Sequence, residues 1–170
     1  MNNHLEITLT AGCPMMCSYC PQDNYIKGYK ATNTTSKKNM SLEDYKVILK
    51  NVDHRINHVF FTGFTEAFAH PEWDKFVEYT MSQGYKTTFN TTLYGATKEK
   101  IDRLVELHVD VEIRCNSNRF FSNVVIPNGD VSVCCSDFSL KHILGNLLTQ
   151  TLEEIHKGEP MRNFFFCCSI

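Results

Sequence analysis

Three cysteines near the start of the chain, Cys13, Cys17 and Cys20, are spaced as C-x3-C-x2-C. Prolines and a glycine stand within and beside this motif and disfavour a regular helix there, because proline lacks a backbone N–H. The motif directly follows residues 5–10, in which apolar and polar side chains alternate as they do in a β-strand. We therefore expect the three thiols to lie on one loop at the end of a strand, where all of them can reach one metal centre.

The number of thiols separates the possible kinds of site. A structural zinc site needs four ligands, and here the fourth would be His4 or a more distant histidine. A disulfide with one spare thiol is a second alternative. The chain has eight cysteines and no recognisable export signal, which favours metal binding over disulfides. An iron–sulfur cube held by three thiolates leaves one iron with an open position for a small molecule.

The cysteine spacing, with Tyr19 just before the third thiol, resembles the signature of the radical S-adenosylmethionine (radical SAM) superfamily. The resemblance implies that Cys13, Cys17 and Cys20 hold a 4Fe–4S cluster whose open iron chelates the amino and carboxylate groups of SAM. One electron from such a cluster breaks a carbon–sulfur bond of SAM, and the resulting 5′-deoxyadenosyl radical abstracts hydrogen from a substrate. Since the cofactor supplies this chemistry, no catalytic side chain is assigned.

A second segment resembles the Gly-Gly-Glu region of the same family, which grips the amino group of SAM. It runs from Phe61 to Glu66 as Phe-Thr-Gly-Phe-Thr-Glu, so Thr62, Gly63 and Glu66 become candidate SAM-binding residues, together with Tyr19. Only one of the two glycines is present, and Ala67 replaces the usual proline. Asn90, at the end of a later strand, is a candidate partner for a sugar or carboxylate; the alternative is an ordinary polar residue at a strand end.

The remaining cysteines predict a second metal site. Cys115, Gly129 and Cys134 form a C-x13-G-x4-C pattern that resembles the start of the SPASM and twitch extensions of radical SAM enzymes. Those extensions carry auxiliary 4Fe–4S clusters, and the cysteines present here favour one such cluster. Its ligands would be Cys115 and Cys134, completed from the set Cys135, Cys167 and Cys168. A structural zinc site with four cysteines is the alternative.

The pattern of elements predicts an α/β fold. Strands are expected at 58–61, 85–92 and 109–113, and the helices between them begin near Ser41, Pro71 and Thr97. The helix that begins near Thr97 is expected to direct Ile101, Leu104 and Val105 toward the core. This alternation indicates a mostly parallel sheet, here a truncated partial (βα) barrel, with ligands at the carboxyl ends of its strands. The division expected is 1–113 for this core and 114–170 for a small module with a β-hairpin at 123–134 and a helix at 152–156.

Residues 21–40 are polar and carry Lys27, Lys30, Lys37 and Lys38. We expect a loop here, either a solvated surface segment or a lid whose lysines attract an anionic substrate.

Composition limits the partners. A net charge of −2 argues against a broad nucleic-acid or membrane surface, and no apolar run is long enough to span a bilayer, so the expected compartment is the cytoplasm. The hypothesis is an oxidoreductase or modifying enzyme of the radical SAM type acting on a peptide or protein; the alternative is a non-enzymatic 4Fe–4S electron or cluster carrier with a degenerate SAM site. An electron donor such as flavodoxin or ferredoxin is expected, and a second copy is a possible cover for the open sheet edge. The short core resembles radical-SAM-like chains of phage genomes.

Overall fold

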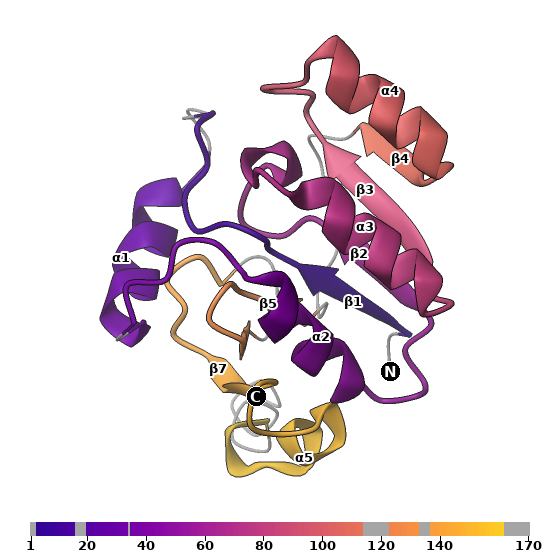
Figure 1. Cartoon of the computed structure of the whole chain (residues 1–170). Helices are drawn as coiled ribbons and strands as arrows, with labels where there is room; N and C mark the ends of the chain where they lie inside the picture. Colours follow the sequence, from indigo (N-terminus) through magenta and orange to yellow (C-terminus); the bar gives the residue numbers. More distant parts are fainter. Residues whose placement is uncertain (1–2, 16–19, 34, 114–122, 133–136, 162–170) are drawn as a thin grey trace.

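The computed structural model describes residues 3–15, 20–33, 35–113, 123–132 and 137–161. Its strands form one open sheet in the order β4-β3-β2-β1-β5-β6-β7 (Figure 1). The parallel part comprises β1 (His4–Ile7), β2 (His58–Phe61), β3 (Lys86–Thr91), β4 (Asp110–Ile113) and β5 (Val124–Val125), which pairs with β1. The antiparallel end comprises β6 (Asp130–Ser132) and β7 (Ile143–Asn146). The expected mostly parallel, unclosed α/β sheet is confirmed.

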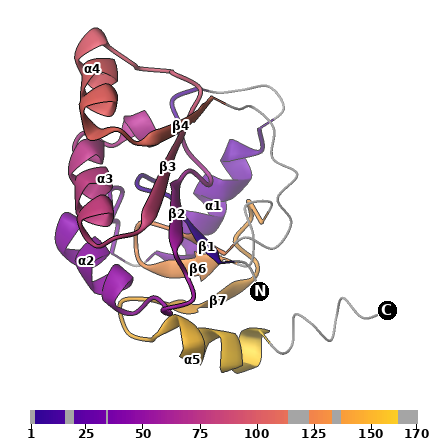
Figure 2. The same cartoon turned by 90° about the vertical axis from the view of Figure 1, so that its right-hand side faces the viewer.

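Three helices cover one face of the sheet: α2 (Leu42–Lys50), α3 (Trp73–Ser82) and α4 (Lys98–Leu107) (Figure 2). Each lies between two parallel strands in the sequence, which is the βαβ arrangement. Two of them begin with the predicted caps. The Ser41 and Thr97 hydroxyls accept the backbone N–H groups of Asp44 and Lys100.

Along β1 and the extended residues that follow it, successive side chains point to opposite faces of the sheet. Leu5, Ile7 and Leu9 are buried in the core beneath the helices. Glu6 and Thr8 project to the opposite face and are also buried, at 2% and 0% exposure. A polar pair is therefore enclosed on the face that the three helices do not cover.

The first difference from expectation is α1, which occupies Gln22–Thr32 where a loop was predicted. Tyr25 and Tyr29 lie one turn apart on this helix, and both are buried, with the Tyr25 ring stacked at 4.7 Å on Phe64. The two tyrosines supply a narrow apolar stripe within an otherwise polar sequence, and tertiary packing of that stripe stabilises the helix.

Two further predictions are corrected. On α4 only Leu104 is buried, whereas Ile101 and Val105 are 37% and 66% exposed. This helix lies over the β4 edge of the sheet, so only a narrow stripe of it finds partners (Figure 2). Strand β7 was not predicted, because Gly145 and Asn146 within it have low strand propensity.

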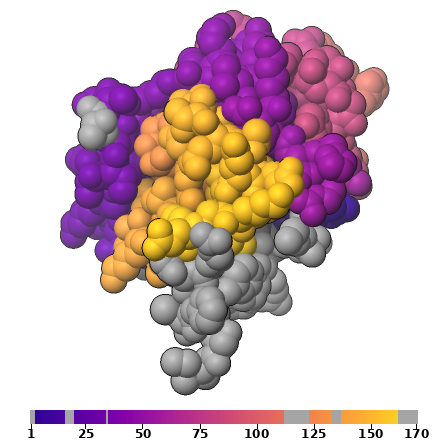
Figure 3. Space-filling view, turned by 90° about the horizontal axis from the view of Figure 1, so that it is seen from below, coloured from indigo at the N-terminus to yellow at the C-terminus, as the bar shows by residue number. Residues whose placement is uncertain are grey.

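The C-terminal part continues the sheet across the boundary expected after residue 113. The hairpin of β5 and β6 forms as predicted, with Gly129 at φ 86° in its turn. The Asn51 side chain at the end of α2 donates to the Leu147 carbonyl at 2.7 Å, and the Asn51 backbone carbonyl accepts the Leu152 N–H at 2.8 Å. Helix α5 (Leu152–Lys157) follows, and Figure 3 shows this orange and yellow part packed against purple N-terminal segments. The described helices include none that is long and apolar enough to cross a membrane.

Candidate functional site

The cysteine loop leaves the sheet at the carboxyl end of β1. The chain stays extended through Thr10, which forms a bridge with Asn39, and turns at Gly12 with φ 101°. Cys13 and Cys20 follow on this loop; both are half-buried and neither is in a disulfide. Cys17 and Tyr19 lie outside the described residues. Two of the three predicted thiols thus lie on the loop that follows the strand end.

A second loop, after β2, is fastened to the extension of β1. The Thr8 hydroxyl donates to the Thr62 carbonyl and accepts the Phe64 N–H, both at 3.2 Å. Gly63 sits between these contacts with φ 97°, and a Cβ there would lie 2.1 Å from the Thr8 Oγ1. Only glycine fits this position, which keeps the Thr62–Gly63 backbone close to the start of the cysteine loop.

Gln22, at the first position of α1, joins the cysteine loop to this second loop. One terminal atom of its amide is 3.8 Å from the Cys20 Sγ. With the amide oriented to satisfy its neighbours, its nitrogen donates to the Phe64 carbonyl at 3.0 Å and its oxygen accepts the Cys13 N–H at 3.3 Å. Sequence reasoning missed this residue, because a glutamine after Pro21 has no distinguishing pattern.

Glu66 lies at the end of the second loop and is 6% exposed. Its Oε1 accepts the Phe68 N–H at 3.2 Å and the Thr91 hydroxyl at 2.6 Å. Its Oε2 accepts the Thr92 N–H at 2.9 Å and the Thr92 hydroxyl at 2.7 Å. Four donors from the protein itself therefore surround the carboxylate and attach the end of β2 to the end of β3.

The end of β3 also reaches the cysteine loop. The Thr92 Oγ1 is 2.7 Å from the sulfur of Met15, which lies two residues after Cys13. Asn90 lies on β3 two residues before Thr92, and its Oδ1 is buried without a hydrogen-bond partner among the described residues. The loops that follow β1, β2 and β3 are consequently tied together at one edge of the sheet, with an orphaned acceptor beside them.

The thiols and the buried polar groups on this edge fit an iron–sulfur cluster with a bound nucleotide better than a zinc ion. Both described thiols are half-buried and belong to a set of three, which leaves a cluster one ligand short. The orphaned oxygen of Asn90 suits a ligand hydroxyl or ammonium group. His4 begins β1, and at about 3.3 Å per residue it lies roughly 20 Å from Thr10 along the strand. A zinc site completed by His4 is therefore excluded, and the described residues, which lack Cys17, contain no group of three metal-binding side chains.

The predicted auxiliary ligands Cys115, Cys134, Cys135, Cys167 and Cys168 lie outside the described residues. The structure does describe β6, which ends at Ser132 two residues before Cys134.

Comparisons with known proteins agree with this geometry. The model of the radical SAM superfamily matches residues 7–114, and that of the SPASM iron–sulfur cluster-binding domain matches residues 115–168. No curated protein matches the chain significantly.

Two crystal structures of BtrN share the fold. One is the selenomethionine protein in an open conformation, with a TM-score of 0.75 and 18% identity, over 96% of this chain and 84% of that one. The other is a complex with AdoMet and 2-DOIA, with a TM-score of 0.75 and 16% identity, over 96% and 85% of the two chains. The family models, one of which spans most of the sequence, decide the assignment: this chain belongs to the radical SAM superfamily, whose cofactors are a 4Fe–4S cluster and SAM, and its C-terminal part is a SPASM iron–sulfur domain.

Proposed function

We propose that this chain is a radical SAM enzyme that generates a radical from SAM and uses it to abstract hydrogen from a substrate. When bound, the 4Fe–4S cluster supplies the electron that cleaves SAM into methionine and a 5′-deoxyadenosyl radical. The observation that carries the proposal is the set of side-chain hydrogen bonds, with the contact between Thr92 and Met15, that fastens the loops after β1, β2 and β3 around the cysteine loop. A carrier of electrons alone has no need of these three loops.

The residues of this edge take separate roles in the proposal. Cys13, Cys17 and Cys20 are the cluster ligands. The Thr62–Gly63 backbone is assigned to the amino group of SAM by its position in the family motif, and its close packing on the Thr8 side chain holds it beside the start of the cysteine loop. Asn90 offers its buried acceptor to the nucleotide or to the SAM amino acid. Glu66 acts as a positioning residue, because its carboxylate already accepts four hydrogen bonds from the protein.

In the same proposal the chain divides functionally at residue 113, although its sheet is continuous. Residues 1–113 form the shortened SAM-cleaving core, and 114–170 form the auxiliary module. One auxiliary cluster is held by Cys115 and Cys134, with its remaining ligands taken from Cys135, Cys167 and Cys168. That cluster anchors substrate or relays an electron to or from the product radical.

The finer assignments rest on the family. A peptide or protein is the proposed substrate, and flavodoxin or ferredoxin the proposed electron donor, in the cytoplasm. The structural relative BtrN binds AdoMet, which supports SAM as the ligand of the same fold here. A second copy is proposed to cover an open edge of the sheet.

The test is anaerobic reconstitution with iron and sulfide, followed by incubation with SAM and dithionite. We expect 5′-deoxyadenosine to form, and a change in the EPR spectrum of the reduced cluster on adding SAM. The Cys13→Ala and Cys20→Ala variants should lose both signals. Clusters that ignore SAM would instead support the carrier hypothesis, and stoichiometric zinc without iron would overturn both.

A further inference from the structure

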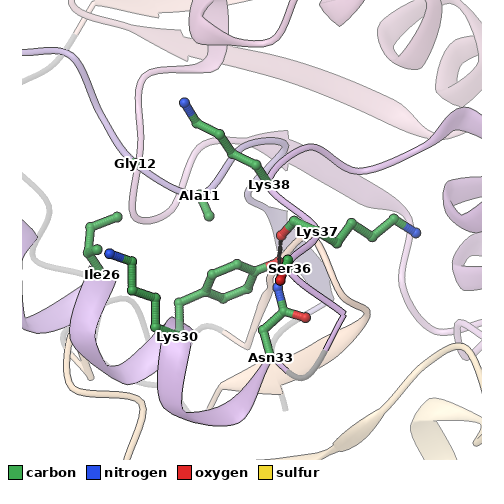
Figure 4. A pocket seen from close by; sticks show the side chains of 9 residues that line it. Ala11, Gly12, Ile26, Lys30, Asn33, Ser36, Lys37 and Lys38 are labelled. Atoms are coloured by element: carbon green, nitrogen blue, oxygen red, sulfur yellow. Dashed lines mark hydrogen bonds between the residues drawn. The ribbon is translucent and has the colours of Figure 1, made fainter.

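A cavity of about 530 Å³ lies on the outer side of the cysteine loop, between α1 and residues 33–38 (Figure 4). Its floor is apolar, and three lysines, Lys30, Lys37 and Lys38, are among its lining residues. The floor is formed by Ala11, Gly12, Ile26 and Tyr29.

Hydrogen bonds within the protein fix the shape of this cavity. The Tyr29 hydroxyl and the Asn33 amide both donate to the Lys37 carbonyl, at 2.6 and 2.8 Å. The Ala11 N–H donates to the Lys38 carbonyl at 2.7 Å. Because these walls are already ordered, binding a partner here costs little conformational entropy of this chain.

The segment is strongly basic compared with the rest of the molecule. Residues 21–40 contain Lys27, Lys30, Lys37, Lys38 and a single acidic residue, Asp23, a net charge of +3. Since the whole chain carries −2, the other residues together carry −5. Lys37 is paired with Asp44 and points away from the cavity in Figure 4. Lys30 and Lys38 are exposed and form no ion pair within the described part of the chain.

The same cavity adjoins the proposed cluster. Gly12 in its wall immediately precedes Cys13, and Lys38 is bonded through its backbone to Ala11. Figure 4 shows the Lys30 and Lys38 side chains extending on the side of Gly12. An apolar centre with a charged rim is the usual anatomy of a protein–protein interface, and the free lysines select an acidic partner.

We propose that this basic cavity is the docking surface for the acidic electron-transfer protein that reduces the cluster. The inference rests on the proposed function, because only a cluster that needs an external electron needs such a partner. The donor, a reduced flavin or iron–sulfur protein, loses one electron, and the oxidised cluster next to Cys13 gains it. The rim lysines attract the carboxylates of the donor, while the apolar floor receives one of its side chains.

Binding and turnover of the Lys30→Glu/Lys38→Glu variant test the proposal. Titration calorimetry with oxidised flavodoxin, an acidic flavin protein, is expected to show affinity at least about tenfold weaker than for the wild type. Formation of 5′-deoxyadenosine driven by reduced flavodoxin should fall by a similar factor, whereas the rate driven by dithionite, a small reductant that needs no docking surface, should remain. Added salt should weaken the wild-type interaction more than that of the variant.

The matched control is Lys50→Glu/Lys86→Glu, which makes the same change in charge. Lys50 ends α2 and Lys86 begins β3, so both lie at the edge of the sheet opposite the cysteine loop. The control should bind flavodoxin as the wild type does. Equal weakening by the two variants, or unchanged binding by the Lys30→Glu/Lys38→Glu variant, overturns the docking surface. Absence of dithionite-driven cleavage in the wild type would overturn the proposed function instead, and the calorimetric comparison would still decide the docking surface.

Discussion

Glu66 shows how one buried side chain organises the edge of the sheet. A carboxylate out of water needs donors for both oxygens, and here Phe68, Thr91 and Thr92 provide them. These donors belong to the loop after β2 and to the end of β3. The family resemblance suggests that Glu66 binds SAM directly, but in this structure its carboxylate joins the loop after β2 to the end of β3.

This role predicts the behaviour of Glu66→Gln. The amide removes the charge and turns an NH2 group toward backbone or hydroxyl donors, so unfolding free energy should fall by about 2–3 kcal/mol. SAM affinity should fall with it, because the end of β3 moves. Chemical denaturation and SAM titration measure the two effects.

Glu72→Gln serves as the control for Glu66. Its carboxylate is 52% exposed and pairs with Lys75 in water, so the variant should unfold at nearly the same denaturant concentration as the wild type. A Glu66→Gln protein with wild-type stability and weakened SAM binding would show that the carboxylate contacts SAM directly.

The sequence could not show this arrangement at the residue scale. Thr91 and Thr92 lie 25 and 26 residues after Glu66, and nothing in their types indicates that they meet it. The same holds for the contact of Met15 with Thr92, 77 residues apart. The cysteine spacing and the lone glycine were visible because they are local patterns, whereas their supports come from distant parts of the chain.

At the scale of elements, His70 connects the start of α3 to the segment that precedes α2. Its ring is 2% exposed; Nε2 donates to the Met40 carbonyl at 3.0 Å, and Nδ1 accepts the Glu72 N–H at 3.2 Å. The contact at Nδ1 requires the neutral ring, because a protonated Nδ1 cannot accept a hydrogen bond, whereas the donation from Nε2 is possible in both states. Burial lowers the pKa of His70 below its usual 6.5, against smaller opposing effects of the Met40 carbonyl and the Glu72 carboxylate.

The consequence is a stability that depends on pH. Below about pH 6.5 the unfolded chain takes up a proton that the folded His70 resists, so unfolding free energy falls as the pH decreases from there. The slope is at most about 1.4 kcal/mol per pH unit for one histidine. In His70→Gln, whose amide keeps a donor for Met40, the slope between pH 5 and 7 should be shallower.

Denaturation series at fixed pH values measure this slope. Some slope should remain in the variant, because burial also lowers the pKa of His156. His54→Gln, in which a 94% exposed ring is lost, controls for removal of an imidazole. An identical slope in His70→Gln and the wild type would contradict the assignment.

Elements were predictable where local signals set their limits. Ser41 and Thr97 cap helices that begin where expected, and Gly84, at φ 83°, follows the end of α3. Helix α1 was missed because two tyrosines within a polar segment give a weak periodicity, and its burial depends on Phe64. Strand β7 is defined by pairing with β6 rather than by its own residues.

At the scale of the whole molecule, residues on both sides of position 113 share one core. Strand β5 pairs directly with β1, and the core cluster beneath the helices joins side chains from both parts. The members from beyond residue 113 are Val125, Val131, Leu144, Leu147, Leu152 and Ile155. At roughly 1.5–3 kcal/mol for each buried side chain, their burial is comparable to the whole stability of an ordinary domain, about 5–15 kcal/mol. The sheet and its core therefore continue across residue 113, and we expect the chain to unfold as one unit.

Leu147→Ala tests that coupling. Leu147 is fully buried, and truncating it should cost about 2–5 kcal/mol. The single tryptophan, Trp73, lies in the N-terminal part at 3% exposure, with its ring 5.0 Å from that of Phe89. Its fluorescence reports unfolding of the core at a distance in sequence from the substitution. If the chain unfolds as one unit, Leu147→Ala shifts the Trp73 transition to lower denaturant, together with the transition followed by far-UV circular dichroism.

Val105→Ala, a truncation of an exposed side chain on α4, should change either transition by no more than about 0.5 kcal/mol. A Trp73 transition that stays in place while circular dichroism shows an earlier partial loss would mean that the C-terminal module unfolds separately.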